Sequence, residues 1–122
     1  MSTYSIIDTP WHTTNIIDCL KDAGIETVIR YYNNGNSNGL PQKRLELNEA
    51  QALSAGGLKI MVIFQTSQNS TDDFTYDKGF QSGTNAYNWA KNTIGQPRNS
   101  AIYFAVDYDA NQAELDSNVI PY

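Results

Sequence analysis

The chain has 122 residues, enough for one domain at most, and 40% of them are hydrophobic, as in an ordinary globular protein. Thirteen acidic residues (Asp+Glu 13) outnumber the 8 Lys and Arg residues and give a formal net charge of −5. This acidic balance, without any basic run, argues against nucleic acid and against an anionic membrane surface as partners. No apolar stretch approaches the roughly 18 residues that a membrane-spanning helix needs, and residues 1–4 lack the features of a signal peptide.

The chain contains a single cysteine, Cys19, and a single histidine, His12. They exclude an intrachain disulfide and a metal centre built from thiolates or from several histidines. We expect no cofactor, and we expect Cys19 to be a small buried side chain.

Four short apolar runs, rich in β-branched and aromatic residues, recur along the chain. They cover residues 4–7, 27–32, 59–64 and 101–106. Short, nearly continuous runs of this kind are typical of strands that are buried on both faces. Segments with helical spacing separate them, at about residues 16–23, 48–55 and 79–94, and each ends at or next to a glycine. The alternation predicts an α/β fold with a parallel sheet and right-handed crossovers.

The connections between these elements differ in length. After the second and third strands they are long and polar, at residues 33–39 and 66–78, whereas the connections from helix to strand are short. This asymmetry is expected when the carboxyl ends of parallel strands carry a binding site. For the Asn- and Gly-rich stretch 33–39, a merely flexible loop is the alternative interpretation.

A polar residue closes each predicted strand: Asp8, Arg30, Gln65, and then Asp107 with Asp109. Because side chains alternate across a strand, Asp107 shares a face with Asp109, Ala105 and Tyr103, while Ile102, Phe104 and Val106 face the helices. The first strand is not followed by a glycine-rich turn, which argues against a nucleotide-binding fold. We therefore expect the polar residues to meet at one end of the sheet.

Carboxylates gathered at the ends of parallel strands suit the cleavage of a glycosidic bond. In this interpretation Asp109 donates the proton, Asp107 and Asp8 supply negative charge beneath an oxocarbenium-like transition state, and one carboxyl group keeps its proton through burial and like-charge repulsion. Arg30 would orient a carboxylate, and Gln65 would bind the sugar. The aromatic residues that could stack on sugar rings are Trp11, Tyr31, Tyr32 and Tyr108.

Each of these roles has an alternative. Asp8 and Arg30 could form a buried ion pair, and the tyrosines could belong to the core. An Asp-x-Asp motif also binds divalent metals in many transferases, so Asp8, Asp107 and Asp109 could hold magnesium or calcium.

Several stretches also resemble a known family: residues 7–9, 20–32, 43–45, 49–60 and 101–109. They are similar to the bacterial glycoside-hydrolase-like domain of formerly unknown function, a family that includes actinobacterial exported cell-wall proteins and is related to the family 25 lysozymes. The resemblance implies a TIM barrel with its site at the carboxyl ends of the strands, and a substrate related to peptidoglycan. In the lysozymes the fourth strand closes with Asp-x-Glu, whose glutamate is the acid. Here the matching positions read Asp107-Tyr108-Asp109, whose last carboxyl group is retracted by about one methylene.

We therefore expect a peptidoglycan-directed glycoside hydrolase of the lysozyme type, acting on cell-wall polysaccharide outside the cell or in the cell wall, with export by a separate route. The alternatives are a non-catalytic glycan-binding or cell-wall module on the same fold, and a metal-dependent transferase or hydrolase.

A complete (β/α)₈ barrel needs at least about 200 residues. Residues 1–122 thus correspond to the N-terminal half, about four βα units, and stop after the fourth strand and the start of its helix. The exposed edges would be covered by a missing C-terminal half or by a second copy of the chain.

Overall fold

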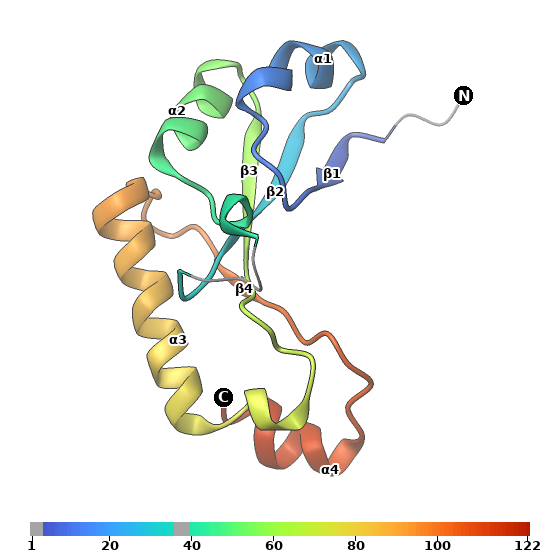
Figure 1. Ribbon diagram of the computed structural model, residues 1–122, viewed down its shortest axis with the longest axis vertical. Helices are drawn as coiled ribbons and strands as arrows, with labels where there is room; N and C mark the ends of the chain where they lie inside the picture. The colour runs from blue at the N-terminus through green and yellow to red at the C-terminus, as the bar shows by residue number, and fades with distance from the viewer. Residues whose placement is uncertain (1–3, 36–39) are drawn as a thin grey trace.

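The computed structural model describes residues 4–35 and 40–122, so part of the predicted loop 33–39 lies outside the described residues. Its centre is a four-stranded parallel sheet in the order β1-β2-β3-β4 (Figure 1). The strands are β1 (Ile6–Asp8), β2 (Thr27–Tyr32), β3 (Lys59–Phe64) and β4 (Tyr103–Phe104). The predicted α/β class and parallel sheet are confirmed. Within the described residues the sheet does not close on itself, because β1 and β4 each pair with one neighbour.

Helices follow each strand. They are α1 (Ile17–Asp22), α2 (Leu47–Ala55), α3 (Tyr76–Asn88), which continues as a π-helix over Trp89–Ile94, and α4 (Gln112–Glu114), which continues as a π-helix over Leu115–Val119. Short 3₁₀ turns precede three of them, at Thr14–Ile16, Pro41–Lys43 and Thr71–Asp73. Figure 1 shows α1 and α2 beside one end of the sheet, α3 running along its flank, and α4 near the start of α3.

Some element boundaries differ from the predicted ones. α3 begins at Tyr76 instead of about residue 79, because the Thr75 side chain accepts a hydrogen bond from the Lys78 N–H and caps the helix. β4 contains two residues instead of six, because the chain soon leaves the ladder with β3. After it, the Asp107 N–H donates to the carbonyl of Gln68 in the preceding loop.

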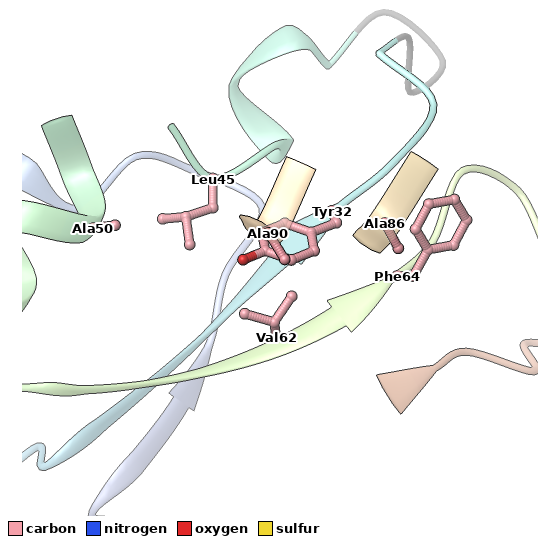
Figure 2. Packing of buried hydrophobic residues seen from close by; sticks show 7 residues of the cluster. All are labelled: Tyr32, Leu45, Ala50, Val62, Phe64, Ala86 and Ala90. Atoms are coloured by element: carbon pink, nitrogen blue, oxygen red, sulfur yellow. The ribbon is translucent and has the colours of Figure 1, made fainter. Parts of the chain in front are cut away.

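The hydrophobic core lies on one face of the sheet, which we call the covered face. Figure 2 shows the side chains of Tyr32, Val62 and Phe64 directed from β2 and β3 toward the helices. Alanines of α3 and its π-helical extension allow this long helix to approach closely, and α1 packs on a second cluster centred on Val28. The two clusters consist of Leu20, Ile25, Val28, Tyr32, Leu45, Ala50, Leu53, Leu58, Val62, Phe64, Ala86 and Ala90.

In the described part of the chain, neither core cluster lies on the opposite face of the sheet, which we call the open face. The strand register and the alternation of side chains place Asp8, Tyr31 and Ile63 on it, with Gln65 and Asp107 just beyond the strand ends. Ile102 packs against the core, and the ring of Phe104 stacks on Phe64, as the predicted alternation requires. On the open face Ile6 and Tyr103 keep more than half of their surface exposed.

Cys19 is exposed on α1, so the expectation that it is buried is wrong. The apolar stripe of this short helix runs through Ile17 and Leu20, and Cys19 lies between them on the outer side. Among the described residues, no helix is long and apolar enough to cross a membrane.

Candidate functional site

Two acidic residues that are far apart in the sequence lie on the open face at the carboxyl end of the sheet. Asp8 closes β1, and both of its carboxylate oxygens accept from the Tyr31 hydroxyl of β2, at 2.6 and 2.8 Å. Asp107 follows β4, and its Oδ2 accepts from the Gln65 amide nitrogen at 3.1 Å. Of the five polar residues expected to meet at one end of the sheet, the structure thus places Asp8, Gln65 and Asp107 on the same face.

Lys43 links the Asp8–Tyr31 pair to the Gln65–Asp107 pair. It ends the 3₁₀ turn after β2, and its ammonium group donates to Gln65 Oε1 at 3.0 Å. The same ammonium lies 4.6 Å from the centre of the Tyr31 ring, within the range of a cation–π interaction. We call Asp8, Tyr31, Lys43, Gln65 and Asp107 the strand-end cluster.

The pKa values of two members of the strand-end cluster, Tyr31 and Lys43, are shifted. Burial, the hydrogen bond to Asp8 and the negative charge of Asp8 raise the pKa of Tyr31 well above its usual value, so Tyr31 acts as a donor at all ordinary pH values. Burial lowers the pKa of Lys43, and the negative charges of Asp107 and Asp8 oppose this change. The negative charge of Asp107 also raises the pKa of Tyr31, so both aspartates act on Tyr31 and on Lys43.

Arg30 is not part of the strand-end cluster, and because it is fully buried its predicted place among the substrate-binding residues is not supported. The residue shares a face with Val28 and Tyr32, as predicted, but that face is the covered one, and Arg30 is fully buried. Its guanidinium pairs with Glu49 of α2 through hydrogen bonds of 3.0–3.1 Å, which Nε and Nη2 donate. The alternative of an ion pair between Asp8 and Arg30 is wrong, because Arg30 pairs with Glu49 and Asp8 accepts from Tyr31.

The Arg30–Glu49 pair fixes the loops from which the strand-end cluster is built. Arg30 Nη1 donates to the carbonyl of Thr9, next to Asp8, and Arg30 Nη2 donates to the carbonyl of Gln42, next to Lys43, both at 2.8 Å. The backbone N–H and hydroxyl of Thr13 donate to Glu49 Oε2 at 2.7 and 2.8 Å. A buried charge pair with all of these partners satisfied holds the two loops in one position.

The aromatic residues expected to stack on sugars are distributed over different environments. Tyr32 is fully buried on the covered face, where its hydroxyl donates to Gln96 Oε1 and burial raises its pKa, so its predicted contact with substrate is wrong. Tyr108 stacks on Phe74, and its buried hydroxyl has no partner among the described residues. Tyr31 belongs to the strand-end cluster, and Trp11, in the loop after β1, is half exposed.

The loop after β3 helps to place the segment that carries Asp107 and Asp109. Gln68 adopts a positive φ of 51°, which is uncommon for a residue other than glycine, and its carbonyl accepts from the Asp107 N–H at 2.8 Å. Its side chain donates to the Tyr122 hydroxyl. Asp109 is exposed, and none of the described residues donates a hydrogen bond to its carboxylate.

The residues give no support to a metal centre. In residues 4–35 and 40–122, no three His, Cys, Asp or Glu side chains gather closely enough to hold a metal ion. Asp8, Asp107 and Asp109 belong to this part of the chain, so the predicted alternative of a magnesium or calcium site on these three residues is wrong.

Two important residues were not found from the sequence. Lys43 lies in a loop, where no periodicity indicates the direction of a side chain. Glu49 lies on the face of α2 that also carries Ala50 and Leu53, and an acidic residue within an apolar stripe indicates a buried partner. This signal could have identified Glu49, but it could not have identified Arg30 as the partner.

The sequence profile of the Rv2525c-like, glycoside hydrolase-like domain matches residues 18–122. The chain belongs to this family. FadG and YbfG of Bacillus subtilis (strain 168), both uncharacterized, are 36% identical over 110 residues and 35% identical over 105 residues. These alignments cover 90% and 84% of this chain, but only 19% and 14% of the two relatives.

Rv2525c of Mycobacterium tuberculosis, whose name provisionally assigns it to the peptidoglycan hydrolases, is 27% identical over 108 residues, which cover 84% of this chain and 44% of the relative. Crystal structures of this Tat-secreted protein, in complex with HEPES and with L-tartrate, superpose with TM-scores of 0.82 and 0.83 at 24% identity. They cover 99% of this chain, which spans 61% and 60% of theirs. At this identity the likeness establishes the fold.

Proposed function

We propose that this chain is part of a peptidoglycan-directed glycoside hydrolase of the lysozyme type, and that its sheet forms the first strands of a TIM-type barrel. Membership of a glycoside hydrolase-like family supports the reaction class. The observation that carries the proposal is the strand-end cluster, because it brings Asp8 and Asp107 together at the carboxyl end of a parallel sheet. A barrel that continues beyond β4 would enclose this end of the open face as a cleft.

In the proposed reaction, Asp109 protonates the oxygen of the scissile glycosidic bond while the bond between that oxygen and the anomeric carbon breaks. Asp107 and Asp8 stabilise the positive charge that develops on the sugar ring. Water supplies the oxygen that joins the anomeric carbon, and its proton returns the acid to its starting state. The Asp109 carboxyl group is exposed, so a substrate can reach it.

The substrate contacts follow from the same geometry. Gln65 already accepts from Lys43 and donates one N–H to Asp107, which leaves its second N–H for a sugar hydroxyl. Trp11 presents an exposed ring that can stack on a sugar. Among the four aromatic candidates, Trp11 is therefore our choice for the sugar platform.

Release of reducing ends from purified peptidoglycan tests this proposal. We expect release by the wild-type protein, and loss of release in Asp109→Asn. Asp18→Asn, which makes the same change at an exposed position of α1, is the matched control and should retain the wild-type rate. Equal release by wild type and Asp109→Asn would contradict the assignment of the acid.

A non-catalytic glycan-binding module is the second candidate, because position 109 carries aspartate where the lysozymes have glutamate. This candidate predicts that the protein sediments with insoluble cell wall and releases no reducing ends. Binding that is lost in Trp11→Ala while no release is detected would favour it over hydrolysis.

We place the whole protein outside the cell or in the cell wall, with cell-wall polysaccharide as its partner. Rv2525c, whose fold this chain shares, is described as Tat-secreted. We also propose that domain 1–122 buries its open face against further barrel strands or against a second copy, because apolar side chains such as Ile6 and Tyr103 are exposed there.

A further inference from the structure

We infer that Lys43 is a positioning residue of the strand-end cluster: its ammonium group sets the orientation of the Gln65 amide, and Gln65 in turn holds the carboxylate of Asp107. The catalytic consequence of this inference rests on the proposed function, whereas the contacts themselves do not.

The direction of the hydrogen bonds follows from the chemistry of the three groups. A lysine ammonium has three donors and no acceptor, so the Gln65 atom that faces it at 3.0 Å must be the amide oxygen. The amide nitrogen must then face Asp107 Oδ2, at 3.1 Å, and donate to it. The reverse orientation would set an N–H group against the ammonium and an oxygen against the carboxylate. Lys43 thus selects one of the two amide orientations, and in that orientation the Gln65 N–H group donates to Asp107 Oδ2.

The backbone presents Lys43 in a fixed place. Its N–H donates to the carbonyl of Leu40 at 3.0 Å, and the neighbouring carbonyl of Gln42 is held by the buried Arg30 guanidinium. The Tyr31 ring lies against the ammonium. Lys43 is therefore not a freely rotating surface lysine, and its half-buried side chain loses hydration in order to reach Gln65.

The loss of hydration of the Lys43 ammonium group allows a positioning role to be distinguished from a merely structural one. Because burial penalises the charged form of Lys43, replacing it with methionine removes a desolvation cost and keeps the apolar stem. We expect Lys43→Met to melt within a few degrees of the wild type or above it. A lysine retained for stability would instead lower the melting temperature when it is replaced.

The test is an NMR measurement of the Gln65 side-chain amide, assigned by its disappearance in Gln65→Leu. In Lys43→Met we expect both amide protons of Gln65 to shift and to exchange faster with solvent, while Lys43→Arg, which keeps a charged donor, retains the wild-type signals. Lys91→Met is the matched control, because Lys91 lies over the ring of Tyr87, at 5.5 Å, in the π-helix that extends α3. Unchanged Gln65 signals in Lys43→Met would overturn the inference.

The catalytic consequence is read separately. On purified peptidoglycan, Lys43→Met should lower kcat by about 10- to 100-fold with little change in KM, as expected when a reacting group is misplaced. Lys43→Arg should recover most of the loss. If the wild-type protein releases no reducing ends, the proposed function fails, and the NMR result still decides the role of Lys43. If Lys43→Met alters the Gln65 signals but leaves kcat at the wild-type value, Lys43 orients Gln65 and the catalytic consequence is contradicted.

Discussion

The Arg30–Glu49 pair provides the sharpest test of how the strand-end cluster is supported, through the substitution Glu49→Gln. Both partners are fully buried, and the Glu49 carboxylate accepts from Arg30 Nε and Nη2 and from the N–H and hydroxyl of Thr13. Glutamine keeps the size of the side chain but removes its charge. In either amide orientation, its NH₂ group meets a donor from Arg30 or from Thr13.

The expected cost follows from leaving the Arg30 charge without a counter-charge. Breaking a buried pair by changing one partner costs about 3–5 kcal/mol. At an m-value of about 2 kcal/mol per M, this cost lowers the urea midpoint by about 2 M. Since domains are stable by only about 5–15 kcal/mol, Glu49→Gln removes a large part of the total stability.

The assay is urea unfolding followed by tryptophan fluorescence, with Glu46→Gln as the matched control. Glu46 makes the same kind of ion pair, with Arg44 at 3.7 Å, but both side chains are partly exposed. Its loss should cost less than about 1 kcal/mol. If Glu49→Gln and Glu46→Gln unfold at the same urea concentration, the buried pair does not hold the loops as we describe.

Three further predictions concern packing, pH and assembly. Gly79→Ala should lower the melting temperature, because a Cβ at this position would collide with the backbone carbonyl of Tyr122. Gly83→Ala, which adds a Cβ in open space on the same helix, should instead stabilise the protein by about 1 kcal/mol. Equal effects of the two substitutions in differential scanning calorimetry would refute this prediction. Burial raises the pKa values of Tyr31 and Tyr32, so above pH about 10 the unfolded chain releases tyrosine protons that the folded chain retains. The free energy of unfolding should therefore fall as the pH rises from about 10 to about 12, and it should fall less in Tyr32→Phe. In analytical ultracentrifugation the isolated chain should associate through its open face, and a well-folded monomer at all concentrations would count against coverage of that face by a second copy.

The fold was largely predictable because it depends on local patterns. The second and third strands agree with the prediction residue for residue, since continuous β-branched runs leave little choice of boundary. The fourth strand and the start of α3 were less well predicted. Their limits are set by contacts beyond the local sequence, such as the bond from Asp107 to Gln68, and by the cap at Thr75.

The candidate site was predicted less completely, for a physical reason that Arg30 illustrates. Alternation tells which residues share a face, and it correctly grouped Arg30 with Val28 and Tyr32. It does not tell which face the helices cover, and the polar character of Arg30 suggested the open one. The side chain that faces the cluster from β2 is instead its neighbour, Tyr31. Lys43 reaches the cluster from a loop, and no pattern within a strand or helix could have placed it there.

The central claim, that Asp109 and the strand-end cluster together hydrolyse a glycosidic bond, is tested most directly by the masses of the fragments released from purified peptidoglycan in ¹⁸O-labelled water. Hydrolysis predicts that each new reducing end carries one labelled oxygen atom, and that these fragments are absent with Asp109→Asn and present with Asp18→Asn. Soluble fragments that carry no label, or labelled fragments produced equally by Asp109→Asn, would contradict the account.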